Sequence, residues 1–437
     1  MKRRLVLNLN TLGVGQRPAA WRHDRIPPHA IIDPGYWSEV ARTAERGGLD
    51  AVFLADTPGL VDPSNRPSGF LEPTVLDAFL AARTERIGFV ATVTSTFNDP
   101  VEWAARALSL DLASGGRFAW NVVTTAENAR IGGNFGVTTF PDRDVRYARA
   151  DEFVRAVRAL WQSAGTGRDV DFAGEYFHFN AHLDMPPSPQ GHPLVVQAGG
   201  SPQGRALGAR NADMLFTAEL VLDAAREHYR AAKAEAAAAG RDPDDLLVLP
   251  GVSFVLADTE TAAREKYDAL EALAPGAADY ALARMSDSLG IDARDLDLDA
   301  PLPAEVLAAE VSAAGFRGSL GYRESVLRLV AEQPDASLRQ LLRYFGGYGQ
   351  RIIIGTPEQA AEGIAAWFEQ EAADGFNLMI DRIPDGLDIF VDHVVPLLRH
   401  RGIAREDEHG QDTLRERLLR SHRAPLPSSA RPRVRGS

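Results

Sequence analysis

One stretch of the chain, residues 197–210 (QAGGSPQGRALGAR), combines residue types that can bind an anion. Gly200 and the glycine before it let a backbone approach a ligand closely, and Ser201 can cap the helix that the next proline would open. Free amides at such a helix N-terminus favour a phosphate group, and Arg205 can add a charge-assisted hydrogen bond. The segment is therefore either a phosphate-binding turn or an ordinary capped connection between a strand and a helix.

Further polar residues stand at the ends of apolar runs. Taken singly, each can be a helix cap or a partner for loop backbone. Taken together, they describe a pocket rich in hydrogen-bonding groups and poor in strong acids and bases. Such a pocket suits a planar heteroaromatic such as a flavin, where the cofactor brings the chemistry. The residues are Asp56, Thr92, Thr94, Ser95, Asn121, Thr124 and Thr125.

Other kinds of site find less support. The chain has no cysteine, which excludes thiolate nucleophiles, disulfides and cysteine-ligated metals. His178 and His182 have helical spacing but fall in a segment that we interpret as strand and loop, so we expect no metal site. A hydrolase using two carboxylates would draw on acids such as Glu102 and Asp111, yet both fall on a predicted helix, away from strand ends.

The elements that must position these residues alternate between short apolar runs and amphipathic stretches, which is typical of βα units. Helices are predicted over 36–48 and 145–161, and the nucleotide-binding fingerprint G-x-G-x-x-G is missing after the first strand. We predict a TIM (β/α)8 barrel, with its site where the strands end. The predicted strands are 4–10, 51–56, 87–96, 118–125, 193–200, 213–220, 246–258 and 376–381.

Two insertions interrupt the barrel pattern. A hairpin-like segment at 169–187 follows the fourth helix, and a longer insertion at about 274–350 follows the seventh strand. Long loops in a compact domain are commonly lids or binding segments. We expect one domain over 1–402 that includes this lid, and a tail over 403–437 that forms a helix at most and is otherwise disordered.

Charge and hydropathy limit the partners. The formal charge is −13, from 60 acidic and 47 basic residues, so we expect no nucleic-acid partner. The N-terminal MKRRLVLNLN is interrupted by asparagines too early for a signal peptide, and no run approaches the roughly 20 apolar residues that span a bilayer. We expect a cytoplasmic protein that binds no membrane.

Several motifs together resemble the nitrilotriacetate and dibenzothiophene-sulfone monooxygenase group of the bacterial-luciferase-like superfamily. The resemblance covers nearly the whole chain to about Arg401, and the combination of motifs is more specific than any one of them. The motifs are FLAD (53–56), EPTVLDAFLAARTERIGFVAT (72–92), SLDLASGGRFAWNVVTT (109–125), NFG (134–136), RYARADEFVRAVRALW (146–161), PSPQGHPLVVQAGGSPQGRALGARNADMLFT (187–217) and GTPEQAAEGIAAWFEQEAADGFNLM (355–379).

This resemblance implies a two-component, FMN-dependent monooxygenase. A separate NAD(P)H-dependent flavin reductase would supply reduced FMN, which would react with molecular oxygen to form a flavin hydroperoxide. One oxygen atom would pass to a small organic substrate, which the resemblance does not identify. It also implies a homodimer or homotetramer.

The resemblance further assigns residues by motif position. Asn121 would lie beside the flavin and act in catalysis. Arg143 occupies a second catalytic position, four residues before Tyr147, where many relatives carry histidine. The implied cofactor-binding residues are Asp56, Thr92, Thr94, Asn121, Tyr147, Gly200, Ser201 and Arg205.

Three alternatives stay open. A deazaflavin-dependent oxidoreductase of the same fold is the nearest, although the SGGR…WNVVT pattern argues against it. The others are a flavin-binding protein without turnover and a hydrolase without cofactor.

Overall fold

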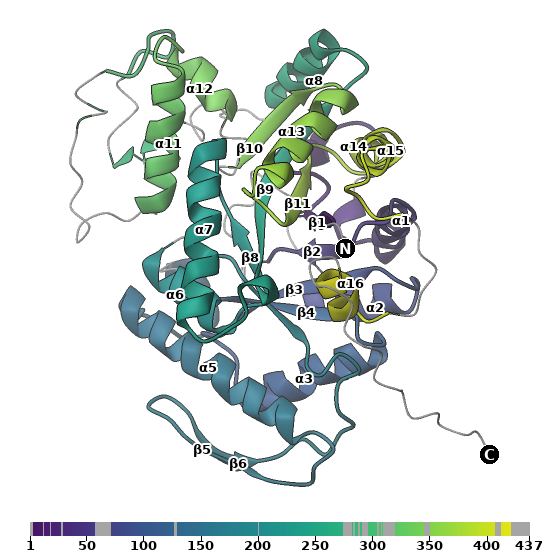
Figure 1. Cartoon of the computed structure of the whole chain (residues 1–437), viewed down its shortest axis with the longest axis vertical. Helices are drawn as coiled ribbons and strands as arrows, with labels where there is room; N and C mark the ends of the chain where they lie inside the picture. Colours follow the sequence, from purple (N-terminus) through teal and green to yellow (C-terminus); the bar gives the residue numbers. More distant parts are fainter. Residues whose placement is uncertain are drawn as a thin grey trace.

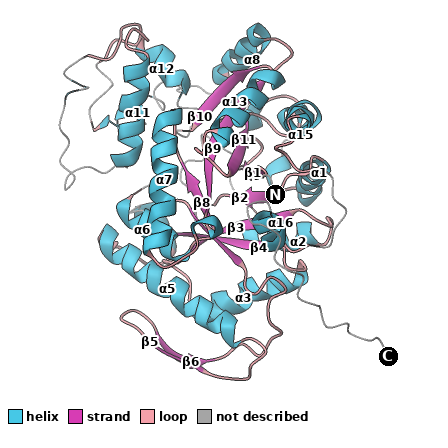
Figure 2. Cartoon of the chain, viewed as in Figure 1, coloured by secondary structure: helices cyan, strands magenta, loops and turns pink. Residues whose placement is uncertain are grey.

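The computed structural model describes residues 3–11, 13–17, 19–27, 29–56, 71–125, 129–199, 201–273, 282, 285–286, 289–290, 296–303, 306, 308, 320–344, 350–406 and 412–420. Within them, a ring of parallel strands is surrounded by helices (Figures 1 and 2).

Eight parallel strands close into a barrel, as predicted from the alternating pattern. The order is β9-β11-β1-β2-β3-β4-β7-β8, and pairing of β8 with β9 closes the ring. All eight fall on predicted strand segments, so the TIM-barrel prediction is confirmed. The strands are β1 (Val6–Thr11), β2 (Ala51–Leu54), β3 (Gly88–Thr94), β4 (Phe118–Val123), β7 (Leu194–Gln197), β8 (Met214–Thr217), β9 (Leu247–Leu256) and β11 (Gly375–Ile380).

Many helices begin at a proline that follows a capping side chain. Asp33 accepts the Gly35 amide, and Asp99 accepts two amides of the next turn. These caps start the first helix two residues before the predicted position. The helices are α1 (Pro34–Arg46), α2 (Pro73–Ala81), α3 (Pro100–Ala113), α4 (Ala129–Asn134), α5 (Arg143–Ser163), α6 (Pro202–Asn211), α7 (Leu222–Ala238), α8 (Glu260–Ala272), α11 (Leu320–Glu332), α12 (Leu338–Tyr344), α13 (Pro357–Glu369), α14 (Asp385–Ile389), α15 (Val395–His400) and α16 (Leu414–Arg420), with 3-10 turns at Ala20–Arg22, Ala30–Ile32 and Pro243–Asp245 and a π-helical turn at Phe390–Val394.

The outer face of β4 anchors one side of the barrel. Trp120 points away from the barrel axis, packs against Trp103, Phe153 and Trp161, and donates its indole N–H to the Val93 carbonyl at 2.9 Å. Successive strand residues face opposite sides of a sheet. The neighbouring Asn121 is therefore directed into the barrel.

The amino-terminal end of the barrel is closed by the C-terminal helix. Leu414 and Leu418 of α16 join the apolar cluster inside the barrel, which includes Val6 and Phe53. The opposite end, formed by the carboxyl ends of the strands, is where TIM-barrel enzymes carry their active sites, and it is called the open end below.

The predicted hairpin is present as antiparallel β5 (Val170–Ala173) and β6 (His178–Ala181). It lies along the outside of α5 (Figure 1), where Phe177 packs edge-on against Phe153 at 5.5 Å. Glu152 of α5 accepts three amides from its turn.

The longer insertion carries α11 and α12. Their apolar residues form a separate core that also includes Leu220 and Val221, next to β8. A ninth strand of the main sheet, β10 (Arg351–Gly355), pairs with β9 outside the closed ring and was not predicted. Among the described helices, none is long and apolar enough to cross a membrane.

Candidate functional site

Two of the predicted site residues meet inside the barrel. Thr92 of β3 and Asn121 of β4 are ladder partners, and the Asn121 amide nitrogen donates to the Thr92 hydroxyl at 2.9 Å. Both side chains are buried. Their strands end a few residues later, so this pair lies toward the open end of the barrel.

Polar atoms in this region lack partners among the described residues. They are the side-chain oxygen of Asn121, the amide nitrogen of Asn10 on β1 and the hydroxyl of Ser253 on β9. All three residues are at most 3 % exposed. A buried polar group without a hydrogen bond costs about 1–3 kcal/mol, so such atoms in one region indicate a place where a ligand or water binds.

Asn10 and Ser253 were not predicted as site residues. Asn10 follows Asn8 at the two-residue strand period, and the Asn8 amide contacts Asn377 across the ladder at 3.3 Å, which places both on the inner face. Ser253 lies at the same period from Leu249, an inner residue. The alternation of asparagine with leucine in the first strand was the signal available in the sequence.

The turn between β7 and α6 is tightly built, as the residues of segment 197–210 led us to expect. Ser201 caps α6 and accepts the Gly204 amide at 3.1 Å. A methyl group on Gly199 would lie 2.4 Å from the Gln197 amide, 3.0 Å from the Gly204 backbone and 3.1 Å from the Tyr147 hydroxyl. The turn therefore leaves little room for a side chain at Gly199, and the same packing brings Tyr147 of α5 beside the turn.

The remaining predicted residues have varied surroundings. Asp56 is half-buried two residues after the end of β2, and the Thr94 hydroxyl lies 2.9 Å from that of Thr125. Arg143 is exposed at the first position of α5. Gly200 lies outside the described residues.

Arg205 contacts α7 and not the turn between β7 and α6. Its guanidinium lies 3.5 Å from the Glu235 carboxylate on α7. It lines a recess of about 180 Å³ together with Glu219, His228 and Arg328. A direct bond from Arg205 to a phosphate at the turn would have to compete with the Glu235 carboxylate.

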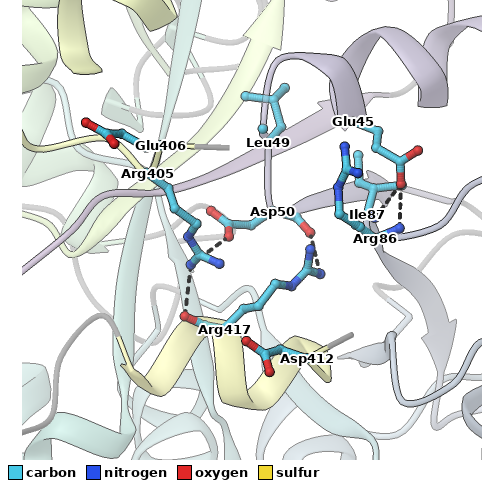
Figure 3. A pocket seen from close by; sticks show the side chains of 10 residues that line it. Glu45, Leu49, Asp50, Arg86, Ile87, Arg405, Glu406, Asp412 and Arg417 are labelled. Carbon is cyan, nitrogen blue, oxygen red and sulfur yellow. Dashed lines mark hydrogen bonds and ion pairs between the residues drawn. The ribbon is translucent and has the colours of Figure 1, made fainter. Parts of the chain in front are cut away.

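A second pocket lies at the opposite, amino-terminal end of the barrel (Figure 3). Its charged groups bind one another: Arg405 lies 3.1 Å from the Asp50 carboxylate, and Arg405 also donates to the Arg417 carbonyl at 2.8 Å. Its volume of about 50 Å³ is too small for a flavin. We interpret this pocket as a gap between the barrel and the C-terminal segment that packs against it. No group of side chains suited to a metal ion occurs in the described part of the chain.

Comparisons with known proteins identify the family to which this barrel belongs. The family model for luciferase-like monooxygenases matches residues 16–374. Nitrilotriacetate monooxygenase component A of Aminobacter aminovorans is 39% identical over 92% of this chain and 94% of that protein.

Solved structures of related enzymes share the fold of this chain. EDTA monooxygenase from Chelativorans sp. BNC1 superposes with a TM-score of 0.82 at 34% identity, over 95% of this chain and 98% of that one. A riboflavin lyase solved with modified FMN and riboflavin gives a TM-score of 0.77 at 31% identity, over 95% and 96%.

The chain therefore belongs to the luciferase-like monooxygenase family. The predicted resemblance to the nitrilotriacetate monooxygenase group is confirmed, and so is the predicted enzyme class, a flavin-dependent monooxygenase.

Proposed function

We propose that this protein is the oxygenase component of a two-component system. It binds reduced FMN supplied by an NAD(P)H-dependent flavin reductase and uses molecular oxygen to oxygenate a small organic substrate. The bound reduced flavin would supply the electrons that activate oxygen. The designation of the nitrilotriacetate relative as component A of its monooxygenase supports a division of the reaction between two proteins.

The observation that carries the proposal is the set of unpartnered buried atoms at the open end of the barrel. The oxygen of Asn121, the amide of Asn10 and the hydroxyl of Ser253 present an acceptor and two donors from three strands. A flavin ring also has both donors and acceptors on its edge. These residues therefore fit the cofactor in chemical type.

The turn between β7 and α6 fits the other end of FMN. The glycine-rich backbone before Ser201 and the N-terminus of α6 suit a phosphate. Pro202 has no N–H and the Gly204 amide donates to Ser201, so the Gln203 amide and the Ser201 hydroxyl would be the donors of this turn. Tyr147, beside Gly199, can donate its hydroxyl to the same group. Gly200 and Arg205 complete this half of the proposed site, with Arg205 acting after it leaves Glu235.

The proposed roles of the other residues follow their positions. Asp56, Thr92 and Thr94 would border the ring, since they lie at the carboxyl ends of β2 and β3. Asn121 would hold a polar atom of the ring or of bound oxygen through its free oxygen and its amide. Arg143, exposed at the start of α5, would orient the substrate at the mouth.

We also propose that the insertion at about 274–350 covers the site within a single domain. This domain extends beyond the expected boundary at 402 to include α16, because Leu414 and Leu418 pack inside the barrel. The separate core of α11 and α12 rests on Leu220 and Val221, directly after β8, so movement of this unit would act on the open end of the barrel. A closed cover would exclude water from the reaction. We propose assembly into a homodimer or homotetramer.

The proposal is tested by following flavin reduction and substrate-free oxygen consumption. With FMN and NADH but no reductase, stopped-flow absorbance should show no useful reduction of FMN. With an added flavin reductase, the protein should bind the reduced FMN and consume oxygen. Rapid reduction by NADH alone would contradict the two-component assignment, and the absence of any reduced-FMN binding would contradict the flavin site.

A further inference from the structure

In the described part of the chain, strand β10 has a partner strand on one side only. It stands at the end of the sheet and pairs with β9. Gly355 pairs with Leu256, and its carbonyl accepts the Ala257 amide. In a parallel ladder a residue bonded in this way directs its amide and carbonyl to the same neighbour, and the next residue directs both away. Ile352 and Ile354 therefore direct their N–H and C=O groups away from β9.

These outward groups find no hydrogen-bond partner anywhere in the described part of the chain. An open edge of this kind is a template for another strand, and proteins usually cover or charge it. The centre of β10 carries no charged residue. Its three successive isoleucines favour pairing with another strand.

A groove of about 480 Å³ opens beside this edge. Its volume falls within the range of sites that bind small molecules and short peptide segments. Among the described residues no carboxylate lines the groove, although Glu260 and Asp268 lie next to Arg264 and Arg343 and the whole chain carries a formal charge of −13. The polar lining residues are Arg264, Arg343, Arg351, Gln333, Gln340 and Gln359.

Two of these arginines differ in how firmly they are held. Arg264 bonds to Glu260 one turn earlier on α8. Arg343 of α12 is nearly half exposed and lies 3.8 Å from Asp268, which is too long for a hydrogen bond. Arg343 therefore has N–H groups available for a carboxylate that enters the groove.

We propose that β10 binds an extended, acidic segment of a partner protein as an added strand. The segment would pair with the free amides and carbonyls of Ile352 and Ile354, and its carboxylates would bind Arg343 and Arg264. Backbone pairing supplies affinity in this mode of recognition, and the side-chain contacts supply specificity. A second copy of this chain is a poor occupant, because its own β10 would bring the same arginines together.

Binding can be tested with the full-length protein and a synthetic peptide of alternating valine and glutamate, titrated by fluorescence anisotropy. A control peptide carries lysine in place of glutamate. The acidic peptide should bind at least about tenfold more tightly than the basic one. Equal binding, or no binding of the acidic peptide, would overturn the proposal.

Variants locate the interaction. Arg343→Glu should weaken the acidic peptide about tenfold, whereas Arg339→Glu on the same helix should not, because Arg339 bonds to Asp299 outside the groove. Ile354→Pro removes an outward amide without removing a bond to β9, and should also weaken binding. An effect of Arg339→Glu equal to that of Arg343→Glu would place the peptide elsewhere.

Hydrogen exchange tests the edge directly. The Ile352 and Ile354 amides should exchange rapidly in the free protein and more slowly with the acidic peptide bound. Strong protection of both amides in the free protein would show that another segment already covers the edge. This experiment requires no flavin, so its outcome is independent of the proposed function.

Discussion

The two ends of the barrel differ in whether their buried polar groups have hydrogen-bond or ion-pair partners. At the amino-terminal end, Arg415 of α16 bonds to Asp213 at 2.8 Å and to the Gln190 carbonyl at 3.0 Å, and Arg405 pairs with Asp50. At the carboxyl end, Asn121, Asn10 and Ser253 keep atoms without described partners. Paired groups at one end hold the fold together, while unpaired groups at the other end are available to a ligand.

Removing a paired group at the closed end should cost stability. Arg415→Ala leaves the buried Asp213 carboxylate without its main partner, and breaking a buried ion pair costs about 3–5 kcal/mol. Thermal unfolding should show a large fall in melting temperature, while activity per folded molecule stays normal. Arg42→Ala is the matched control, because the exposed Arg42–Glu39 pair contributes roughly 0.2–1 kcal/mol. Equal stability of the two variants would show that α16 is not what holds this end together.

Removing an unpaired group at the open end should do the reverse. Asn121→Leu should lower turnover roughly 100-fold, as loss of one preorganised polar group does in other enzymes. Its stability should change by about 1 kcal/mol or less, since one bond to Thr92 is lost together with one unsatisfied oxygen. Steady-state kinetics with a reductase and thermal unfolding measure the two effects. A large loss of stability with normal turnover would assign Asn121 to the fold.

The closed end should also respond to acid. Burial raises the pKa of Asp213, but the opposing effect of Arg415 and the cationic groups near it is larger. The net result is a pKa lowered to about 2. A carboxyl whose pKa is lower when folded stabilises the protein above its unfolded pKa of about 4, and that stability is lost as the pH falls toward 2. The loss should be about 2 kcal/mol, measured by urea unfolding across this range. Arg415→Ala should remove most of this dependence, and an unchanged slope in that variant would refute the link to Asp213.

The sequence predicted the closed-barrel framework more completely than the site inside it. All eight barrel strands have apolar runs of sufficient length, and caps such as Asp33 mark where helices begin. Strand β10 was not predicted because its run of isoleucines lies at the end of a long insertion and no separate barrel strand was expected there.

The site residues show the same limit in more detail. Thr92 and Asn121 could be predicted, since each stands near the end of an apolar run. That Asn10 and Ser253 join them depends on strand register around the closed ring, which single-strand patterns do not contain. The pairing of Arg205 with Glu235 depends on how α6 packs on α7, so spacing alone could not reveal it.

The central claim is that the open end binds reduced FMN with its phosphate at the β7–α6 turn. Anaerobic titration of the wild-type protein and Ser201→Ala with reduced FMN and with reduced riboflavin tests it most directly. Ser201→Ala should weaken FMN roughly tenfold and leave riboflavin, which has no phosphate, nearly unchanged. Arg205→Ala should have the smaller effect, because Arg205 already binds Glu235. Equal weakening of both flavins by Ser201→Ala would contradict the placement of the phosphate and with it the proposed orientation of the cofactor.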